Sequence, residues 1–356
     1  MDQAATLRKI IHNNLKADGR PAQGLERMRS IAIASGKGGV GKTNTALNLA
    51  LSLSRGKRKV LLVDGDLGLA NIDVLLGLTP RHTLEHVIDG RLDIMDVMVN
   101  GPFGLKILPS ASGIGEMSEL SLEKQNVLFR GLRQLDEEMD YLIIDTGAGI
   151  SSNVLRFSAT AGEVVVVVNA EPTSITDAFA LMKLLSVKYR VSHFQLIANS
   201  VASETEGRRV FQRLKRACDQ FLSVRLDFLG AVPTDKHVRL AVRQQKALLE
   251  LYPNSPAGMA LRRIAAKLDQ LRKFVPRNHS PVPPSASSPP LETIPLQTMP
   301  LETMPLETTS SAPSPTPGRA SSEMPLPPED ERTPPQIRNK SRSEFWDRLL
   351  HWKKVR

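Results

Sequence analysis

The sequence has 356 residues, a formal net charge of +10 and a single cysteine, Cys218. A lone cysteine excludes an internal disulfide and a cluster of cysteine metal ligands. The chain begins without a basic-then-apolar leader, and every apolar run is shorter than the about 18 residues of a membrane helix, so we expect a soluble cytoplasmic protein. The positive charge favours an acidic surface, which could be a membrane, a nucleic acid or another protein.

Residues 1–20 predict a short amphipathic helix followed by a joint. Leu7, Ile10, Ile11 and Leu15 fall on one helical face, and the breaker-rich stretch 17–21 separates them from the rest of the chain. An isolated helix of this length is marginal in water. We therefore expect it to dock, either on the chain's own body or on a partner.

The most specific motif follows the apolar run Ile31–Ala34. Gly36-x-x-x-x-Gly41-Lys42-Thr43 matches the phosphate-binding loop (P-loop), and a helical pattern over 44–50 completes its strand–loop–helix context. Its glycines let backbone N–H groups surround an anion at a helix N-terminus. In this motif Lys42 reaches the β- and γ-phosphates, and the Thr43 hydroxyl holds Mg²⁺. Lys37 is an additional lysine, which would repel Lys42 unless a highly charged ligand or a partner's phosphate lies nearby.

Short apolar runs predict a doubly wound α/β domain over about 25–275, with a mostly parallel sheet. Their apolarity is continuous rather than alternating, so both faces of the sheet should be covered by helices. A leucine-rich stripe over Leu261–Phe274 predicts the last packed helix. The predicted strands are Ile31–Ala34, Val60–Val63, Leu105–Leu108, Tyr141–Ile144, Val164–Val168, Leu196–Ala198 and Phe228–Val232.

Polar side chains directly follow several of these runs, as a ligand site at the carboxyl ends of parallel strands requires. Asp64 and Asn199 each follow such a run, and Asp145 closes another as in a Walker B motif, where the carboxylate orients Mg²⁺. The acidic turn that contains Asp64 and Asp66 could also be only a solvated turn. Asp73 could cap a helix, and Asn199 could be a turn residue. His193 and His237 show no partner pattern, which indicates surface or structural roles.

Residues 276–340 predict a disordered linker. The stretch is rich in proline, serine and threonine, and it contains a near-repeat over 291–308. Such a composition cannot bury enough apolar surface to offset its ordering entropy. A proline-rich ligand for a recognition domain is the alternative interpretation.

Residues 341–356 predict an amphipathic tip helix. Ser341-x-x-Glu344 fits a capping box, and Phe345, Leu349 and Trp352 share one face among basic residues. This composition is typical of helices that lie in a membrane interface. A helix that packs on a protein is the alternative.

Lys37-Gly-Gly-Val-Gly-Lys42-Thr43 resembles the deviant Walker A motif of the MinD/ParA class of ATPases. The resemblance implies a slow, switch-type ATP hydrolase that uses ATP and Mg²⁺. It also implies a homodimer in which Lys37 crosses to the other subunit's nucleotide. Asp66 would position or activate the attacking water, Asp64 would support the metal site, the loop 146–150 would sense the γ-phosphate, and Asn199 with the loop 232–235 would hold the adenine.

These matches define three sets of predicted residues. The catalytic set is Lys37, Lys42 and Asp66, and the metal set is Thr43, Asp64 and Asp145. The nucleotide-binding set is Gly36, Lys37, Gly38, Gly39, Val40, Gly41, Lys42, Thr43, Asn44, Asn199, Pro233 and Asp235.

The N-terminus narrows the resemblance further. Asp2-Gln3-Ala4-x-x-Leu7-Arg8 resembles the activator motif of the FlhG (FleN) family, MinD-type regulators of flagellar number and placement. Further matches at Asn44, 231–235, 241–247 and 252–255 extend the resemblance over about 1–275, but not over the linker. It implies stimulation of FlhF, a signal-recognition-particle-type GTPase. Through the tip it implies reversible association with the cytoplasmic (inner) membrane, at a cell pole. Flagellar switch-ring proteins and a flagellar transcription regulator would be further partners.

Other classes share the deviant P-loop. An iron–sulfur scaffold needs paired cysteines, and a tyrosine kinase of this class needs tyrosines after about residue 274; the sequence has neither. A DNA-partition or division-site ATPase that positions another cargo stays open, because the basic run 208–216 could bind phosphates. A solvated basic helix explains that run equally well, and the motifs at the two ends of the chain are not required for binding to DNA. Nucleic acid is therefore not expected as a partner.

Overall fold

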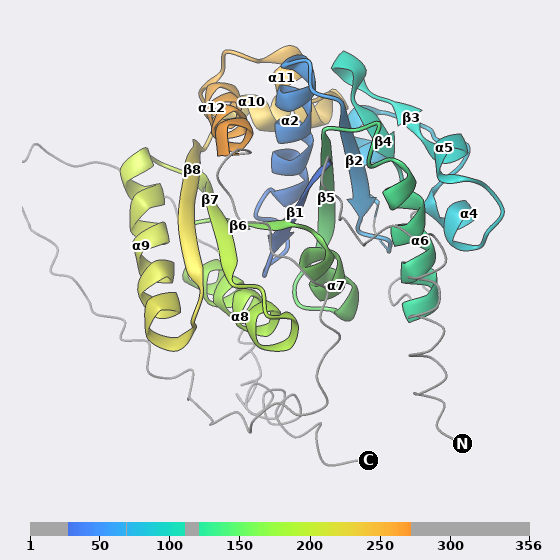
Figure 1. Cartoon of the computed structure of the whole chain (residues 1–356). Helices are drawn as coiled ribbons and strands as arrows, with labels where there is room; N and C mark the ends of the chain where they lie inside the picture. Colours follow the sequence, from blue (N-terminus) through green and yellow to red (C-terminus); the bar gives the residue numbers. More distant parts are fainter. Residues whose placement is uncertain (1–27, 69, 111–120, 272–356) are drawn as a thin grey trace, which may run out of the picture. The chain divides into compact units, whose positions relative to one another are not determined.

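The computed structural model describes residues 28–68, 70–110 and 121–271 (Figure 1). They belong to the first of two units of the chain, Met1–Pro289. The predicted N-terminal helix, proline-rich linker and tip helix lie outside the described residues. In the part that is described, no helix is both long and apolar enough to cross a bilayer.

An eight-stranded sheet forms the centre of the fold, in the order β3-β4-β2-β5-β1-β6-β7-β8. Every neighbouring pair is parallel except β3 and β4. β1 pairs with β5 on one side and β6 on the other, so the strand order reverses there, as in a doubly wound sheet. The strands are β1 (Arg29–Ser35), β2 (Val60–Gly65), β3 (Val99–Asn100), β4 (Lys106–Leu108), β5 (Tyr141–Ala148), β6 (Glu163–Val168), β7 (His193–Val201) and β8 (Arg225–Pro233).

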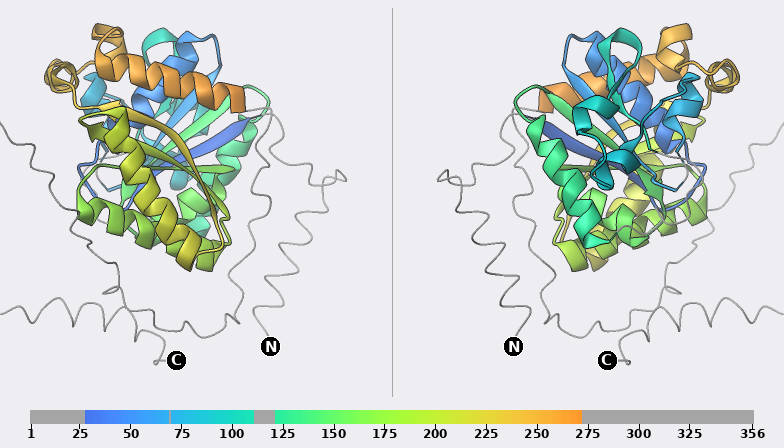
Figure 2. Two further views of the ribbon diagram at one scale, coloured as in Figure 1. Left: turned by 90° about the vertical axis from the view of Figure 1, so that its left-hand side faces the viewer. Right: turned by 90° about the vertical axis from the view of Figure 1, so that its right-hand side faces the viewer.

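Helices cover both faces of this sheet, and Figure 2 shows α12 and α9 on opposite sides of it. One layer contains α2 (Lys42–Arg55), α10 (Lys236–Arg243), α11 (Leu248–Leu251) and α12 (Pro256–Leu271). The other contains α4 (Leu84–Ile88), α5 (Ile94–Val97), α6 (Leu122–Gln134), α7 (Ser152–Thr160), α8 (Pro172–Tyr189) and α9 (Glu204–Phe221). The short α3 (Ile72–Leu76) follows β2, and the 3-10 turn η1 (Pro102–Gly104) separates β3 from β4.

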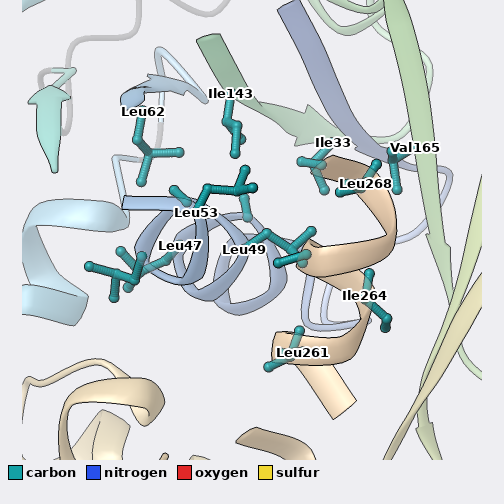
Figure 3. Close-up of a cluster of buried hydrophobic side chains, with 14 of the residues drawn as sticks. Ile33, Leu47, Leu49, Leu53, Leu62, Ile143, Val165, Leu261, Ile264 and Leu268 are labelled. Carbon is teal, nitrogen blue, oxygen red and sulfur yellow. The ribbon is translucent and has the colours of Figure 1, made fainter. Parts of the chain in front are cut away.

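The central strands have continuous apolar sequences because helices cover both faces of the sheet. Alternate residues of each strand face opposite helix layers, so both sets must be apolar. Ile143 on β5 and Val165 on β6 pack with α2 and α12 (Figure 3). Ile144 and Val166 contribute to the clusters on the other face. The predicted last helix is confirmed, although it begins at Pro256, earlier than the stripe suggested.

A polar network fixes the end of α12 near the N-terminal ends of β1 and β5. Arg29, the first residue of β1, forms a buried ion pair with Glu163, the first residue of β6, and also donates to the carbonyl of Leu268. The Tyr141 hydroxyl donates to Asp269 Oδ1 at 2.7 Å, and Arg58 donates to the same carboxylate. Because a buried charge is tolerated only when it is paired and hydrogen-bonded, this network defines one position for the helix.

Two features of the sheet differ from the sequence prediction. The pattern analysis missed β3, because a two-residue antiparallel edge strand has no apolar period of its own. β5 does not stop at Asp145 but continues to Ala148, with an irregular register against β1. Asp145 therefore lies inside a strand that is buried up to Thr146, rather than at its exposed end.

Candidate nucleotide-binding site

The P-loop connects the buried end of β1 to the first turn of α2. Gly41 is the N-cap of α2 and has a φ of 85°, which disfavours any residue with a side chain. A Cβ on Gly41 would lie 2.2 Å from Asn199 Nδ2, and one on Gly36 would meet the backbone of Asp177 at the same distance. The loop can thus approach β7 and α8 only with glycine at both positions, and its N–H groups can turn inward as an anion nest.

Lys42 and Asp145 form a buried pair at the centre of the site. Lys42 Nζ lies 2.5 Å from Asp145 Oδ1, and the two side chains are 7% and 0% exposed. Burial raises the pKa of the Asp145 carboxyl, although the Lys42 ammonium and the nearby Thr43 hydroxyl oppose the rise. Asp145 Oδ2 is buried and, among the described residues, has no hydrogen-bond partner.

The donor set around Asp145 fits Mg²⁺. A buried carboxylate oxygen without a partner and a neighbouring hydroxyl are hard oxygen ligands of the kind this ion prefers. Asp66 adds negative charge, which further raises the Asp145 pKa. No cluster of three or more His, Cys, Asp or Glu in the described part could hold a metal ion by itself. A Mg²⁺ ion here would therefore need oxygens from phosphate or water as well.

Asp64 organises the loop that follows β2. It lies opposite Asp145 in the pairing of β2 and β5. Its oxygens accept hydrogen bonds from the N–H groups of Asp66 (3.2 Å), Asn71 (2.9 Å) and Ile72 (3.1 Å). Burial and the neighbouring Asp145 raise the pKa of Asp64 to about 7, while the three N–H donors oppose that rise. These contacts show that Asp64 holds the main chain of this loop in place, and its predicted role at the metal site stays a prediction.

Asp66 points toward Gly147 near the end of β5. A Cβ placed on Gly147 would lie 3.6 Å from Asp66 Oδ1. The structure therefore brings the residue predicted to act on water close to the loop predicted to sense the γ-phosphate. Asp73 lies in the first turn of α3, but Asn71, not Asp73, is the N-cap of that helix.

Lys37 has a counter-charge within its own chain. Its ammonium pairs with Glu171, the N-cap of α8, and donates to Thr173 Oγ1 at 2.9 Å. The Lys37 ammonium lowers the pKa of Glu171. The expectation that only a ligand or a partner's phosphate could balance Lys37 is therefore wrong. The sequence did show Glu171 shortly after a predicted strand, but nothing in it indicated that the side chain reaches Lys37.

The residues predicted for adenine binding lie together but are partly engaged in the fold. Asn199 Nδ2 donates to the Val40 carbonyl at 2.8 Å, which ties β7 to the P-loop. Asp235 is the N-cap of α10, and its carboxylate also accepts from the Ala257 N–H at 3.0 Å. Burial disfavours its ionised form, but hydrogen bonds from Ala257 and His237 outweigh this effect and lower its pKa to about 2. Because its carboxylate is occupied, Asp235 would have to contact a base through its main chain.

Both histidines without a predicted partner do have one. His193 Nε2 lies 2.8 Å from Asp227, and His237 Nδ1 lies 2.7 Å from Asp235. The basic run on α9 is also partly paired, since Arg208 contacts Glu204 and Lys215 contacts Asp219. These contacts support structural roles for the histidines, and they occupy two of the basic side chains of α9 with carboxylates of the same helix.

Comparison with known families places the site in a class. The AAA domain family matches residues 28–195. The Pseudomonas aeruginosa protein named antiactivator FleN is 47% identical over 239 residues, which cover 67% of this chain and 85% of that protein. The Helicobacter pylori flagellum site-determining protein YlxH is 36% identical over 239 residues, with coverages of 67% and 81%.

Solved structures agree with the sequence relatives. The cell division ATPase MinD of Pyrococcus furiosus superimposes with a TM-score of 0.57 at 25% identity, over 68% of this chain and 99% of that one. MinD of Pyrococcus horikoshii, solved as a complex with Mg-ADP, gives a TM-score of 0.56 at 27% identity, over 68% and 97%. The predicted doubly wound α/β fold of the MinD/ParA type is thereby confirmed.

Proposed function

Since this chain belongs to the FlhG (FleN) family of flagellar regulators within the MinD/ParA class of P-loop ATPases, we propose that it is an ATP-dependent dimerising switch that sets the number and placement of flagella. The observation that carries the proposal is the buried Lys42–Asp145 pair, with one carboxylate oxygen left unpaired beside a glycine-rich anion nest. This arrangement fits a phosphate group with Mg²⁺.

Each residue of the site has a defined task in this proposal. The backbone N–H groups of residues 36–43 bind the phosphates, and Lys42 shares its charge between Asp145 and the β/γ-phosphates. Thr43 and Asp145 would hold Mg²⁺, which, when bound, neutralises charge on the phosphates. Asp66, held near Gly147, orients the attacking water and accepts its proton. Lys37 leaves Glu171 to contact the nucleotide of a second subunit.

Different relatives support different parts of the proposed function. The Pyrococcus horikoshii protein was solved with Mg-ADP bound, which supports a nucleotide with Mg²⁺ at the equivalent loop. The names FleN and YlxH support a flagellar role. A complex of MinC with MinD from Aquifex aeolicus, 26% identical to this chain, supports the view that such ATPases act by binding partners.

We extend the proposal to the two ends of the chain. The motif at residues 2–8 stimulates the GTPase FlhF, and residues 341–356 associate reversibly with the cytoplasmic membrane, with a cell pole as the site of action. One short helix gives only marginal membrane affinity. Two copies in a dimer raise avidity by roughly 10²–10⁴-fold, provided that both can reach the surface at once. Flagellar switch-ring proteins and a flagellar transcription regulator complete the proposed partners.

One set of experiments tests the switch and both ends. The full chain should hydrolyse ATP with Mg²⁺, form a dimer by light scattering with ATP but not with ADP, and accelerate GTP hydrolysis by FlhF. Deletion of residues 2–8 should remove only the last activity. Replacement of Trp346 and Trp352 by Glu should abolish co-sedimentation with anionic vesicles and leave ATP hydrolysis unchanged. Full stimulation of FlhF without residues 2–8, or the same mass with both nucleotides, would contradict the corresponding part.

A further inference from the structure

Two buried side chains hold the main chain of Asp66, the residue that follows β2: Asp64 at the end of β2, and Ser110 after β4. Its N–H donates to Asp64 Oδ1 at 3.2 Å. Its carbonyl accepts a hydrogen bond of 3.2 Å from the hydroxyl of Ser110. The two bonds fix the peptide groups on either side of the Asp66 Cα, and so they fix the position of the Cα from which the side chain extends.

Ser110 is well suited to hold another residue in place. Its side chain is 1% exposed, and it follows β4, the strand that pairs with β2. The preceding carbonyl, that of Pro109, accepts a 2.8 Å hydrogen bond from the N–H of Leu84 at the start of α4. Ser110 is therefore anchored by parts of the fold that lie outside the P-loop.

The chemistry of a buried hydroxyl gives this contact its weight. A hydroxyl removed from water without a partner costs free energy, and the Asp66 carbonyl is the partner that the structure gives it. On its other side, Asp66 faces Gly147, which lies two residues after Asp145 on β5. The main chain of Asp66 is thus tied to the end of β2 and to the residue after Pro109, and its side chain is directed at the end of β5.

We propose that Ser110 is a positioning residue for ATP hydrolysis, whose hydroxyl holds the Asp66 main chain so that the carboxylate meets the attacking water. The inference rests on the proposed function, since it needs Asp66 to act in hydrolysis. The Ser110 hydroxyl donates to Asp66 and not to Lys42 or the P-loop, so it should affect the rate of hydrolysis and not the binding of ATP.

The test is the steady-state ATPase activity of the full chain with Ser110→Ala. We expect kcat to fall about 10-fold, because a small displacement of a catalytic group has effects of this order or larger. The KM for ATP, the affinity for a fluorescent ATP analogue and the ATP-dependent dimer mass should stay unchanged. Ser110→Thr, which keeps the hydroxyl, should recover most of the lost kcat.

Ser158→Ala is the matched control. Ser158 on α7 is also fully buried, but its hydroxyl has no hydrogen-bond partner among the described residues. Its removal should leave kcat at the wild-type value. In an Asp66→Ala background Ser110→Ala should cause no further fall in single-turnover rate, because both changes remove the same function.

The outcomes separate the inference from the function beneath it. A wild-type chain that hydrolyses ATP together with a Ser110→Ala variant of full kcat would overturn the inference alone. Equal losses in Ser110→Ala and Ser158→Ala, or additive losses with Asp66→Ala, would also overturn it. A wild-type chain that binds ATP and does not hydrolyse it would overturn the proposed function, and with it the inference.

Discussion

Lys42 and Lys37 belong to one loop, yet the structure treats them in opposite ways. Lys42 is 7% exposed and pairs with a carboxylate that water does not reach, whereas Lys37 is 37% exposed and pairs with Glu171, itself 56% exposed. A buried pair cannot lose one partner without leaving an uncompensated charge, but an exposed pair exchanges partners at little cost. The buried lysine is therefore suited to a permanent site, and the exposed lysine to a contact that is made and broken.

The largest effect should come from the buried pair. Lys42→Ala leaves the Asp145 charge unpaired and should lower the free energy of unfolding by about 3–5 kcal/mol as well as abolish nucleotide binding. Denaturant unfolding and titration with a fluorescent nucleotide would measure the two effects. Lys42→Ala with Asp145→Asn should regain most of the stability but none of the binding. Equal stability of the single variant and the wild type would show that the Asp145 charge does not depend on Lys42.

Asp66→Ala should lower ATP hydrolysis by about 10²-fold or more, since a positioned general base contributes about that much. Binding of ATP should persist, so the variant should accumulate as the ATP-bound dimer, which gel filtration with light scattering would reveal. Asp73→Ala is a suitable control, because Asp73 lies on α3 and its carboxylate accepts only from the neighbouring Val74 N–H in the described structure. Wild-type turnover by Asp66→Ala would remove Asp66 from the reaction.

Asp64 should make stability depend on pH near neutrality in Mg²⁺-free buffer. Its pKa of about 7 in the folded chain exceeds the ordinary value of 3.8, so the folded state binds the proton more tightly than the unfolded state. Stability from this group is thus full at low pH and is lost as pH rises toward and through about 7, with a slope of at most about 1.4 kcal/mol per pH unit. Urea unfolding of wild type and Asp64→Asn from pH 5 to pH 8 should show a steeper slope in the wild type, because the raised pKa of Asp145 contributes to the slope of both proteins. Parallel slopes would contradict the raised pKa.

The smallest effect on the folded chain should come from the exposed pair. Glu171→Gln removes the counter-charge of Lys37 without exposing any buried charge, so unfolding should be unchanged within error. The ATP-dependent dimer should form at a severalfold lower protein concentration, because Lys37 no longer has to leave a carboxylate. Arg208→Gln, which removes a similar exposed pair on α9, should leave dimerisation unaffected. A dimerisation midpoint equal to that of the wild type would show that the Glu171 contact does not oppose assembly.

The same contrast explains what the sequence could predict. The central strands, the P-loop and Asp145 were predictable because burial on both faces and an anion nest each impose a local residue pattern. The Lys37–Glu171 pair and the Ser110–Asp66 contact were not, because each joins residues far apart in the chain that carry no pattern individually. Asp235 shows a third case. Its position near the site was predicted, but only the structure shows that its carboxylate caps α10 and is already occupied. The predicted roles of all of these residues in catalysis and binding stay predictions until they are measured.

The anchoring of α12 has a practical consequence for labelling. Arg29 and Tyr141 are the first residues of their strands, and together with Arg58 they donate hydrogen bonds to Leu268 and Asp269. The P-loop follows the opposite end of β1. Leu271, the last described residue, therefore lies at the N-terminal ends of the strands, away from the P-loop. A fluorophore placed near this point would report on α12 without crowding the loop that holds Lys37. The same edge is where a surface-immobilised protein should be tethered if its two lysines are to stay accessible to nucleotide and to a second copy.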